Sequence, residues 1–163
     1  MSLTFNANEI FEMAEEIERN GAKFYRKAAE GAKDADTQKY LIDMAVMEDG
    51  HLEIFQHMRQ KLSDGDKVPI TYDPGNEAAL YLQTMADARG YEGKISPALE
   101  LTGKESMEDV LQIAITAERN SVVFYVGLKT LVKSDTGKEQ VDKIIGEEMA
   151  HIATLQKKLL SLQ

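Results

Sequence analysis

A set of polar residues occurs twice in this chain, 100 positions apart, and it constrains the fold more than any other feature. The repeat relates residues 9–62 to 109–162, where 11 of 54 aligned positions are identical. Most of the identical residues are polar or aromatic, and they include the pairs Glu18/Glu118, Arg19/Arg119, Asn20/Asn120, Phe24/Phe124, Tyr25/Tyr125, Glu48/Glu148 and His51/His151. Because an apolar core tolerates exchange among residues of similar volume, the retained polar set indicates chemistry rather than packing.

Four long segments carry apolar residues at alternating steps of three and four, the spacing of one face of an α-helix. These segments span about 8–32, 37–62, 108–132 and 137–160. The sequence predicts N-caps at Asn8, Ser106 and Thr136, of which the last two begin capping boxes. The links near 33–36 and 133–136 are short, so the first two helices are expected to pair antiparallel, as are the last two.

The segment 63–105 differs in composition, because it holds all three prolines and five of the 11 glycines. A short helix is predicted over about 76–89. A connection of this length can run from one end of a helix bundle to the other. We therefore expect one all-α domain over 1–163, a four-helix bundle with helix pairs at 8–62 and 106–162 joined by this crossover.

Each of the four long helices directs a carboxylate toward the core. The residues concerned lie in the apolar stripe near the middle of each helix: Glu18, Glu48, Glu118 and Glu148. Two of them are followed one helical turn later by a histidine, His51 or His151. Four buried carboxylates cannot all stay ionised without compensation, so they take up protons, pair with cations or bind metal.

The same residues match the ligand set of a dimetal site in a four-helix bundle, which takes one Glu from each of two helices and Glu-x-x-His from each of the others. The symmetry of the repeat gives the assignment: Glu48 and Glu148 bridge, Glu18 and Glu118 are terminal carboxylates, and His51 and His151 complete one ion each. The four negative charges of the carboxylates balance the four positive charges of two divalent ions. Oxygen-rich ligation with imidazole suits iron or manganese, with zinc or cobalt as alternatives. A purely structural hydrogen-bond network is disfavoured, because an unmetallated cluster is costly to bury.

Two tyrosines lie on the same helical face as the terminal carboxylates. Tyr25 follows Glu18 by seven residues, and Tyr125 follows Glu118 by the same interval. Their hydroxyls can donate hydrogen bonds to metal ligands. They can equally be core tyrosines whose hydroxyls find other partners, and the sequence leaves both readings open.

Other acidic and histidine residues near the ligands are expected to lie outside the site. His57 follows His51 by six residues and therefore points away from the cluster, toward the surface. Asp49, Glu53 and Glu147 lie on other helix faces and are expected to be solvated.

Composition and charge narrow the class of protein. The chain has no cysteine, so it carries no disulfide and no thiolate metal site. Its 28 Asp and Glu exceed its 19 Lys and Arg, and a net charge of −9 argues against binding to nucleic acid. No stretch approaches the roughly 20 apolar residues of a membrane span, and the first residues lack the pattern of a secretory signal. A cytoplasmic protein without membrane contact is expected.

At the residues described above the chain resembles the ferritin-like superfamily, and within it the diiron domain of rubrerythrins. The specific part is the pattern Glu18…Glu48-x-x-His51 followed by Glu118…Glu148-x-x-His151. The resemblance implies a ferritin-like bundle with a left-handed crossover and a non-haem centre of two iron ions. It also implies peroxide reduction, dioxygen reduction or ferrous-iron oxidation, and a homodimer or larger homo-oligomer, sometimes with exchanged helices.

The chain departs from rubrerythrins at two points. Rubrerythrins carry an additional carboxylate one turn after the third-helix ligand, where this chain has Ser121. Rubrerythrins also usually carry a rubredoxin domain with four cysteines, which is absent here. The resemblance is therefore to a rubredoxin-less, rubrerythrin-like protein, whose electrons would come from a separate donor protein such as a rubredoxin.

The function expected from these observations is that of a non-haem diiron oxidoreductase, a peroxidase or oxidase acting on peroxide or dioxygen under oxidative stress. Two alternatives remain open. A ferroxidase that stores or delivers iron would assemble into a hollow shell. A non-catalytic, metal-binding helical module would bind metal without turnover.

Overall fold

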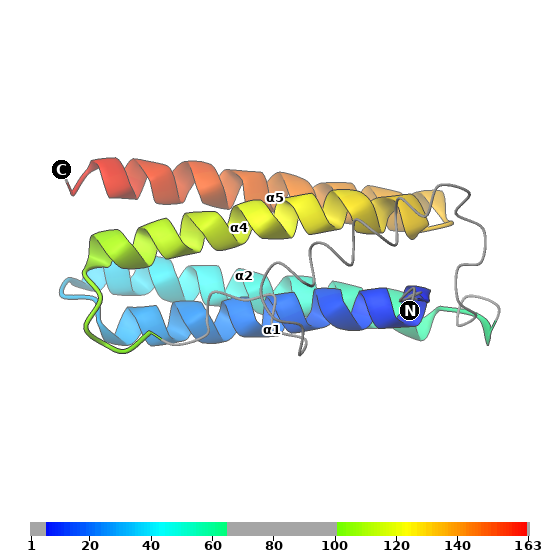
Figure 1. Ribbon diagram of the computed structural model, residues 1–163, viewed down its shortest axis with the longest axis horizontal. Coiled ribbons are helices and arrows are strands. Elements are labelled where there is room, and N and C mark those ends of the chain that lie inside the picture. Colours follow the sequence, from blue (N-terminus) through cyan, green and yellow to red (C-terminus); the bar gives the residue numbers. More distant parts are fainter. Residues whose placement is uncertain (1–5, 65–100, 163) are drawn as a thin grey trace, which may run out of the picture.

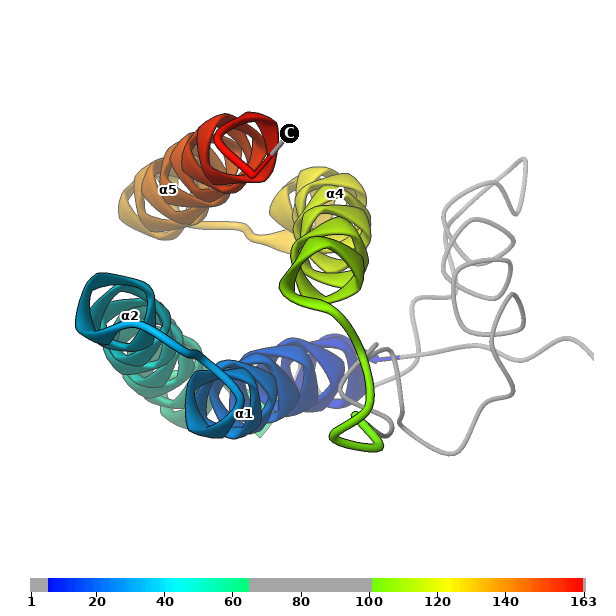
Figure 2. The same cartoon turned by 90° about the vertical axis from the view of Figure 1, so that its left-hand side faces the viewer.

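Four long α-helices make up most of the described residues, 6–64 and 101–162, of this computed structural model. The helices are α1 (Ala7–Glu30), α2 (Ala35–Gln60), α4 (Met107–Leu131) and α5 (Asp135–Leu160). They lie alongside one another (Figure 1), and a view along their length places them at the four corners of a bundle (Figure 2). The described ranges contain no strand, so the predicted all-α four-helix bundle is confirmed. The short helix expected at 76–89 lies outside the described residues.

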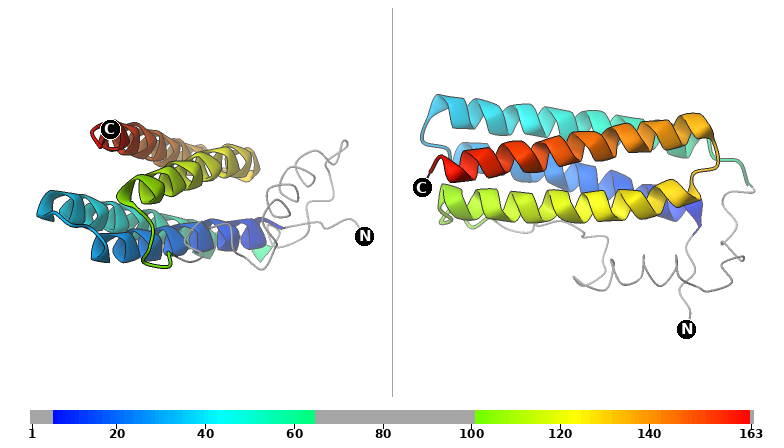
Figure 3. Two further views of the ribbon diagram at one scale, coloured as in Figure 1. Left: turned by 60° about the vertical axis from the view of Figure 1, so that its left-hand side comes forward. Right: turned by 90° about the horizontal axis from the view of Figure 1, so that it is seen from above.

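The helices are arranged as two antiparallel pairs. α1 packs mainly against α2, and α4 packs mainly against α5. The two pairs face each other through α1 against α4 and α2 against α5, an arrangement also visible from two further sides (Figure 3). The colour sequence in Figure 1 shows that α1 and α5 run in one direction and α2 and α4 in the other, so every packed neighbour is antiparallel. None of the described helices carries an apolar stretch that could cross a membrane.

The first helix begins two residues earlier than predicted. Its N-cap is Asn6, whose Oδ1 accepts a hydrogen bond from the Glu9 amide at 2.9 Å. The Glu9 carboxylate accepts in return from the Asn6 amide at 2.8 Å. The prediction of Asn8 as the cap was wrong because only Asn6 has an acidic residue three positions later to complete a capping box. At the third helix the predicted box is confirmed, since Ser106 Oγ accepts from the Asp109 amide at 3.1 Å.

The last helix also begins before its predicted cap. Ser134, rather than Thr136, is the N-cap, and its Oγ accepts from the Gly137 amide at 3.1 Å. Gly137 therefore lies inside the first turn, where it approaches the end of α4 closely. A Cβ at this position would lie 2.6 Å from Val132 Cγ1 and 3.4 Å from Met58 Cε. The absence of a side chain lets α5 start against both α2 and α4.

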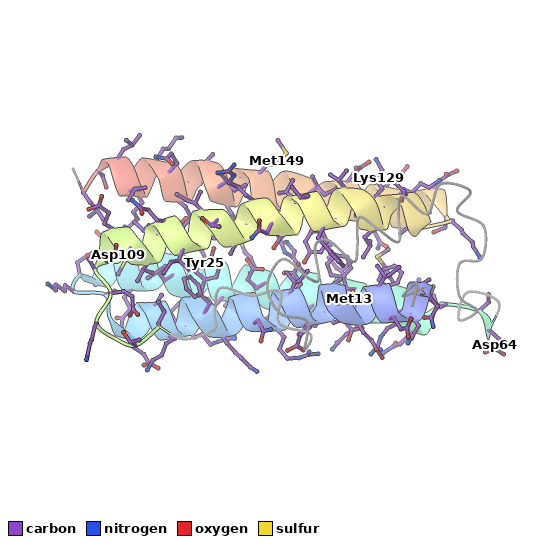
Figure 4. All side chains as sticks on the ribbon, viewed as in Figure 1. Met13, Tyr25, Asp64, Asp109, Lys129 and Met149 are labelled. Carbon is purple, nitrogen blue, oxygen red and sulfur yellow. The ribbon has the colours of Figure 1, made fainter. Side chains whose placement is uncertain are left out.

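The apolar core consists of two clusters on either side of the middle of the bundle. The first apolar cluster includes Phe11, Met13, Phe55, Phe124, Leu128 and Ile144. The second apolar cluster includes Phe24, Leu41, Leu111, Leu155 and Leu159. Met13 of the first cluster and Tyr25 of the second lie on opposite sides of the midpoint of α1 (Figure 4). Buried polar residues lie between the two clusters.

Candidate metal centre

All six residues that the sequence assigns as ligands come together between the two apolar clusters. Each is at most 4% exposed, and the set comprises Glu18, Glu48, His51, Glu118, Glu148 and His151. They form two groups whose ligand atoms lie within 4.8 Å of one another: Glu18, Glu48, His51 and Glu148 in one, and Glu48, Glu118, Glu148 and His151 in the other. Glu48 and Glu148 belong to both groups, which is the geometry that bridging carboxylates require. Each helix contributes one carboxylate, as the periodicity predicts.

The two histidines direct the same ring nitrogen into the cluster. His51 Nδ1 lies 2.9 Å from Glu148 Oε1 and 3.4 Å from Glu18 Oε2. His151 Nδ1 lies 3.2 Å from Glu148 Oε2, and it also faces Glu48 Oε1 at 3.5 Å and Glu118 Oε1 at 3.6 Å. The rings are nearly parallel, with centroids 6.0 Å apart and an interplanar angle of 25°. Both Nε2 atoms therefore remain for contacts outside the cluster.

The two tyrosines connect the helix pairs by a crossed pair of hydrogen bonds. The Tyr25 hydroxyl of α1 donates to Glu118 Oε1 of α4, and the Tyr125 hydroxyl of α4 donates to Glu18 Oε1 of α1. Burial, followed by the neighbouring carboxylates, raises the pKa of both hydroxyls well above the ordinary value. Each hydroxyl therefore stays protonated and acts as a donor that orients a terminal carboxylate.

Several buried atoms of the cluster are left without a hydrogen bond. Among the described residues, Glu18 Oε2, Glu48 Oε1, His51 Nδ1 and Glu148 Oε1 make no hydrogen bond of good geometry, although His51 Nδ1 and Glu148 Oε1 lie only 2.9 Å apart. An unsatisfied polar atom in a protein interior costs about 1–3 kcal/mol, more when it is charged. All four atoms belong to proposed ligands. Oxygen and imidazole nitrogen atoms that converge without partners suit divalent metal ions, so these residues fit the group that the fold pattern implies.

The carboxylates of the metal-free cluster share protons unequally. Burial, reinforced by Glu148 and Glu18, raises the pKa of Glu48 well above its usual range. Burial and the neighbouring Glu148 raise the pKa of Glu118 to about 8. Burial also acts to raise the pKa of Glu148, but hydrogen bonds to Glu118 and the two histidines outweigh it, and that pKa is lowered. Glu148 therefore stays ionised.

Without bound metal, both histidine rings of the cluster are also protonated at neutral pH. Burial disfavours the charged ring of His51, but the adjacent carboxylates of Glu148 and Glu18 outweigh burial and raise the pKa to about 11. For His151, Glu118 and Glu148 likewise overcome burial and raise the pKa to about 9. A metal ion requires neutral imidazole and ionised carboxylate, so metal binding would displace these protons.

The acidic residues expected outside the site are only partly where the sequence places them. Glu53 and His57 are exposed, as predicted, and Asp49 is half-buried in an ion pair with Arg26. Glu147 is different, because its Oε2 lies 2.9 Å from His51 Nε2 and its side chain is 32% exposed. The prediction of a solvated Glu147 was wrong because its side chain reaches across to the facing helix α2.

A buried ion pair that was not predicted from the sequence lies next to the site. Glu15 is 3% exposed, and its Oε1 lies 2.6 Å from Arg59 Nε of α2. A signal was present, since Glu15 lies four residues after Phe11 and three before Glu18, on the same helical face. Burial raises the pKa of Glu15, with the cation of Arg59 opposing that effect. The pair anchors α1 to α2 beside the ligands.

The position at which rubrerythrins carry an additional carboxylate holds no acidic group. Ser121 is half-buried, and its hydroxyl donates to the Ala117 carbonyl of its own helix at 3.2 Å. Its counterpart in the other half is Gly21, where a Cβ would lie 3.2 Å from Glu48 Oε2. The space beside Glu48 is therefore occupied by the ligand itself.

Comparisons with known proteins agree with the four-helix fold. A family model described as a ferritin-like domain matches residues 6–161. A structure from Thermotoga maritima, assigned as a ferritin-like diiron-carboxylate protein, superposes with a TM-score of 0.74 at 21% identity, covering 100% of both chains. A hypothetical protein from Pyrococcus furiosus superposes with a TM-score of 0.67 at 19% identity, covering 98% of this chain and 93% of that one. No curated protein matches the sequence significantly.

Proposed function

We propose that this chain, which belongs to the ferritin-like domain family, is a non-haem diiron oxidoreductase that reduces peroxide or dioxygen. The observation that carries the proposal is the buried cluster of four carboxylates and two imidazoles, with converging atoms that have no hydrogen-bond partner among the described residues. The Thermotoga maritima structure, described as a diiron-carboxylate protein, supports the same choice of metal.

Each proposed ligand has a defined role. Glu48 and Glu148 would bridge the two ions, because each lies within reach of both groups of ligand atoms. Glu18 and His51 would complete the ion on one side, and Glu118 and His151 would complete the ion on the other. Tyr25 and Tyr125 hold the terminal carboxylates in place by hydrogen bonds from the opposite helix pair.

When bound, two iron ions would supply Lewis acidity and the electrons that reduce the oxidant. Reduction of one peroxide to two waters consumes two electrons and two protons, and the chain has no cysteine that could supply the electrons. We therefore propose that a separate reduced redox protein, of the rubredoxin class, re-reduces the centre. The apolar clusters on both sides exclude bulk water from the ligands.

The experiment that tests this proposal combines metal counting with rapid kinetics. Protein produced with iron is expected to hold two irons per chain. After anaerobic reduction, the diferrous protein is mixed with peroxide and separately with dioxygen, and its oxidation is followed by stopped-flow absorption. Oxidation that is faster with peroxide supports a peroxide reductase, and oxidation that is faster with dioxygen supports an oxidase or ferroxidase.

Two outcomes would redirect the proposal. A chain that holds stoichiometric iron but assembles into a hollow multi-subunit shell and mineralises iron would be a storage protein. A chain that binds no stoichiometric metal, and that tolerates alanine at both Glu48 and Glu148, would have a purely structural polar layer. The matched control is Glu53→Ala, because Glu53 is an exposed glutamate on the same helix as Glu48.

A further inference from the structure

The repeat is broken at one position that contacts the cluster. Positions 47 and 147 are equivalent in the two halves, but the first is Met47 and the second is Glu147. Each precedes a bridging glutamate, and each reaches the outer nitrogen of the histidine in the facing helix. His51 Nε2 lies 2.9 Å from Glu147 Oε2, whereas His151 Nε2 lies 3.4 Å from Met47 Sδ.

These two contacts differ in strength. A carboxylate only accepts hydrogen bonds, so the proton at the His51–Glu147 contact lies on Nε2, and Nδ1 is the atom that would give up its proton and offer a lone pair to an ion in the cluster. A thioether sulfur is a weak acceptor and fixes neither the tautomer nor the ring orientation as firmly. Glu147 is itself held from the other side, because Lys143 Nζ lies 3.7 Å from its Oε1.

We propose that the two ion positions are unequal: the position completed by His51 binds a divalent cation more tightly than the position completed by His151, and Glu147 is the positioning residue that causes the difference. The inference rests on the proposed dimetal function. A carboxylate on the outer nitrogen of a histidine ligand orients the ring and increases its basicity, and loss of such a partner weakens metal affinity about 10- to 100-fold. The centre would therefore fill in order, with the His51 position first.

The test isolates each position with a matched pair of variants. Glu118→Ala removes a ligand from the His151 side and leaves the His51 position, and Glu18→Ala does the reverse. Each variant is titrated anaerobically with Co²⁺ alone, and binding is followed by visible absorption of the ion. We expect the Glu118→Ala protein to bind its ion about 10- to 100-fold more tightly than the Glu18→Ala protein.

Exchange of Glu147 and Met47, the residues that contact the two Nε2 atoms, then tests whether Glu147 causes the difference in affinity. In the Glu118→Ala background, Glu147→Met is expected to weaken Co²⁺ binding to the level of the Glu18→Ala protein. In the Glu18→Ala background, Met47→Glu is expected to strengthen Co²⁺ binding to the level of the Glu118→Ala protein. The controls change charge by the same amount without a contact to either ring: Glu53→Met at an exposed site near His51, and Met149→Glu, where Met149 is 59% exposed on the outer side of α5 (Figure 4).

A second measurement uses the complete ligand set. In the Co²⁺-loaded protein, the Nε2 proton of His51 is expected to give a shifted NMR resonance that exchanges slowly with solvent, because Glu147 holds it. Glu147→Met should abolish that slow exchange while two ions still bind. This readout remains available if the variants that lack Glu18 or Glu118 do not fold.

The outcomes separate the inference from the proposed function. Wild-type protein that binds no Co²⁺ would overturn the dimetal proposal and this inference together. Equal affinities in the Glu118→Ala and Glu18→Ala proteins, or an effect of Glu147→Met no larger than that of Glu53→Met, would overturn the inference alone.

Discussion

The two halves of the molecule, α1 with α2 and α4 with α5, keep the same cluster residues but have different apolar residues around them. Ala28 and Leu128 occupy equivalent positions, and both are buried. Phe55 and Leu155 are likewise equivalent, and both are fully buried. Each cluster of the core thus combines large and small residues differently, although both halves place a glutamate and a tyrosine at the same points.

This difference shows that apolar core positions of the bundle can change in sequence more freely than the positions of the cluster. A change of core volume at one position can be absorbed by a compensating change at a neighbour, because close packing depends on the sum of the volumes. A ligand position has no such substitute, since its donor atom has to reach a fixed point between four helices. The cluster is therefore the part of the repeat that stays symmetrical, with Met47 and Glu147 as its exception.

The largest expected effect comes from removing a carboxylate that both halves share. Glu48→Ala and Glu148→Ala should each reduce metal content from two ions per chain to fewer than one, because both ions lose a ligand at once. Metal analysis after anaerobic gel filtration measures this effect. If one of the two variants kept two ions, the symmetrical assignment of the bridging residues would be wrong.

Rising pH should destabilise the metal-free protein, and the His151 side of the cluster should lose its protons at lower pH than the His51 side. The folded-state pKa values of Glu118, about 8, and His151, about 9, lie above their ordinary values of 4.5 and 6.5. The stability that these bound protons contribute is complete below the ordinary pKa values and is lost as pH rises through the folded ones. The free energy of unfolding should therefore fall as pH rises from about 4.5 to about 9.

His51 is expected to keep its proton over that range, because its pKa is about 11. Urea denaturation at a series of pH values measures the loss of stability, and NMR titration of the ring protons assigns it to residues. In the Glu118→Gln variant the dependence on pH should weaken. A His51 resonance that titrates before that of His151 would reverse the expected order of the two sides.

Removal of either tyrosine hydroxyl should have equal effects in the two halves. Tyr25→Phe leaves Glu118 without its donor from α1, and Tyr125→Phe leaves Glu18 without its donor from α4. Each change is expected to lower the free energy of unfolding of the metal-free protein by about 1–3 kcal/mol. Urea denaturation checks this value. If the two losses of unfolding free energy differ by more than about 1 kcal/mol, the crossed hydrogen bonds are not equivalent.

The smallest expected effects concern two helical glycines of α2 and α1. Gly50 corresponds to Ala150 in the other half, and an added Cβ there meets nothing within 4 Å among the described residues. Gly50→Ala should therefore stabilise the protein by about 1 kcal/mol. Gly21→Ala should gain less than this, because its Cβ would lie 3.2 Å from Glu48 Oε2. Equal gains in thermal unfolding would mean that Glu48 has room to move.

Much of the fold and of the candidate site follows from periodicity alone. A step of three or four residues fixes which side of a helix a residue occupies, so the burial of Glu18 and Glu148 could be predicted without knowing what faces them. Short links predicted the antiparallel pairs. The assignment of the six residues to metal remains a prediction, although their convergence is now visible.

The rest depends on how far one helix lies from another, which the sequence does not encode locally. Glu147 lies one position before a ligand and was expected in solvent, but the distance between α2 and α5 lets its side chain reach His51. Glu15 was missed for a related reason, since its partner Arg59 is 44 residues away in the sequence. The helix start at Asn6 could have been found from Glu9 three positions later, whereas the start at Ser134 required knowledge of the side-chain partner at the cap.

The division of the core into two apolar clusters by a layer of acids also bears on how long the molecule survives in a cell. Any ligand that binds only the folded chain adds to its stability in proportion to the logarithm of the free ligand concentration. Because proteases act on unfolded molecules, the amount of this protein would follow the supply of the metal that fills the layer. Metal scarcity would then shorten its lifetime without any change in its synthesis.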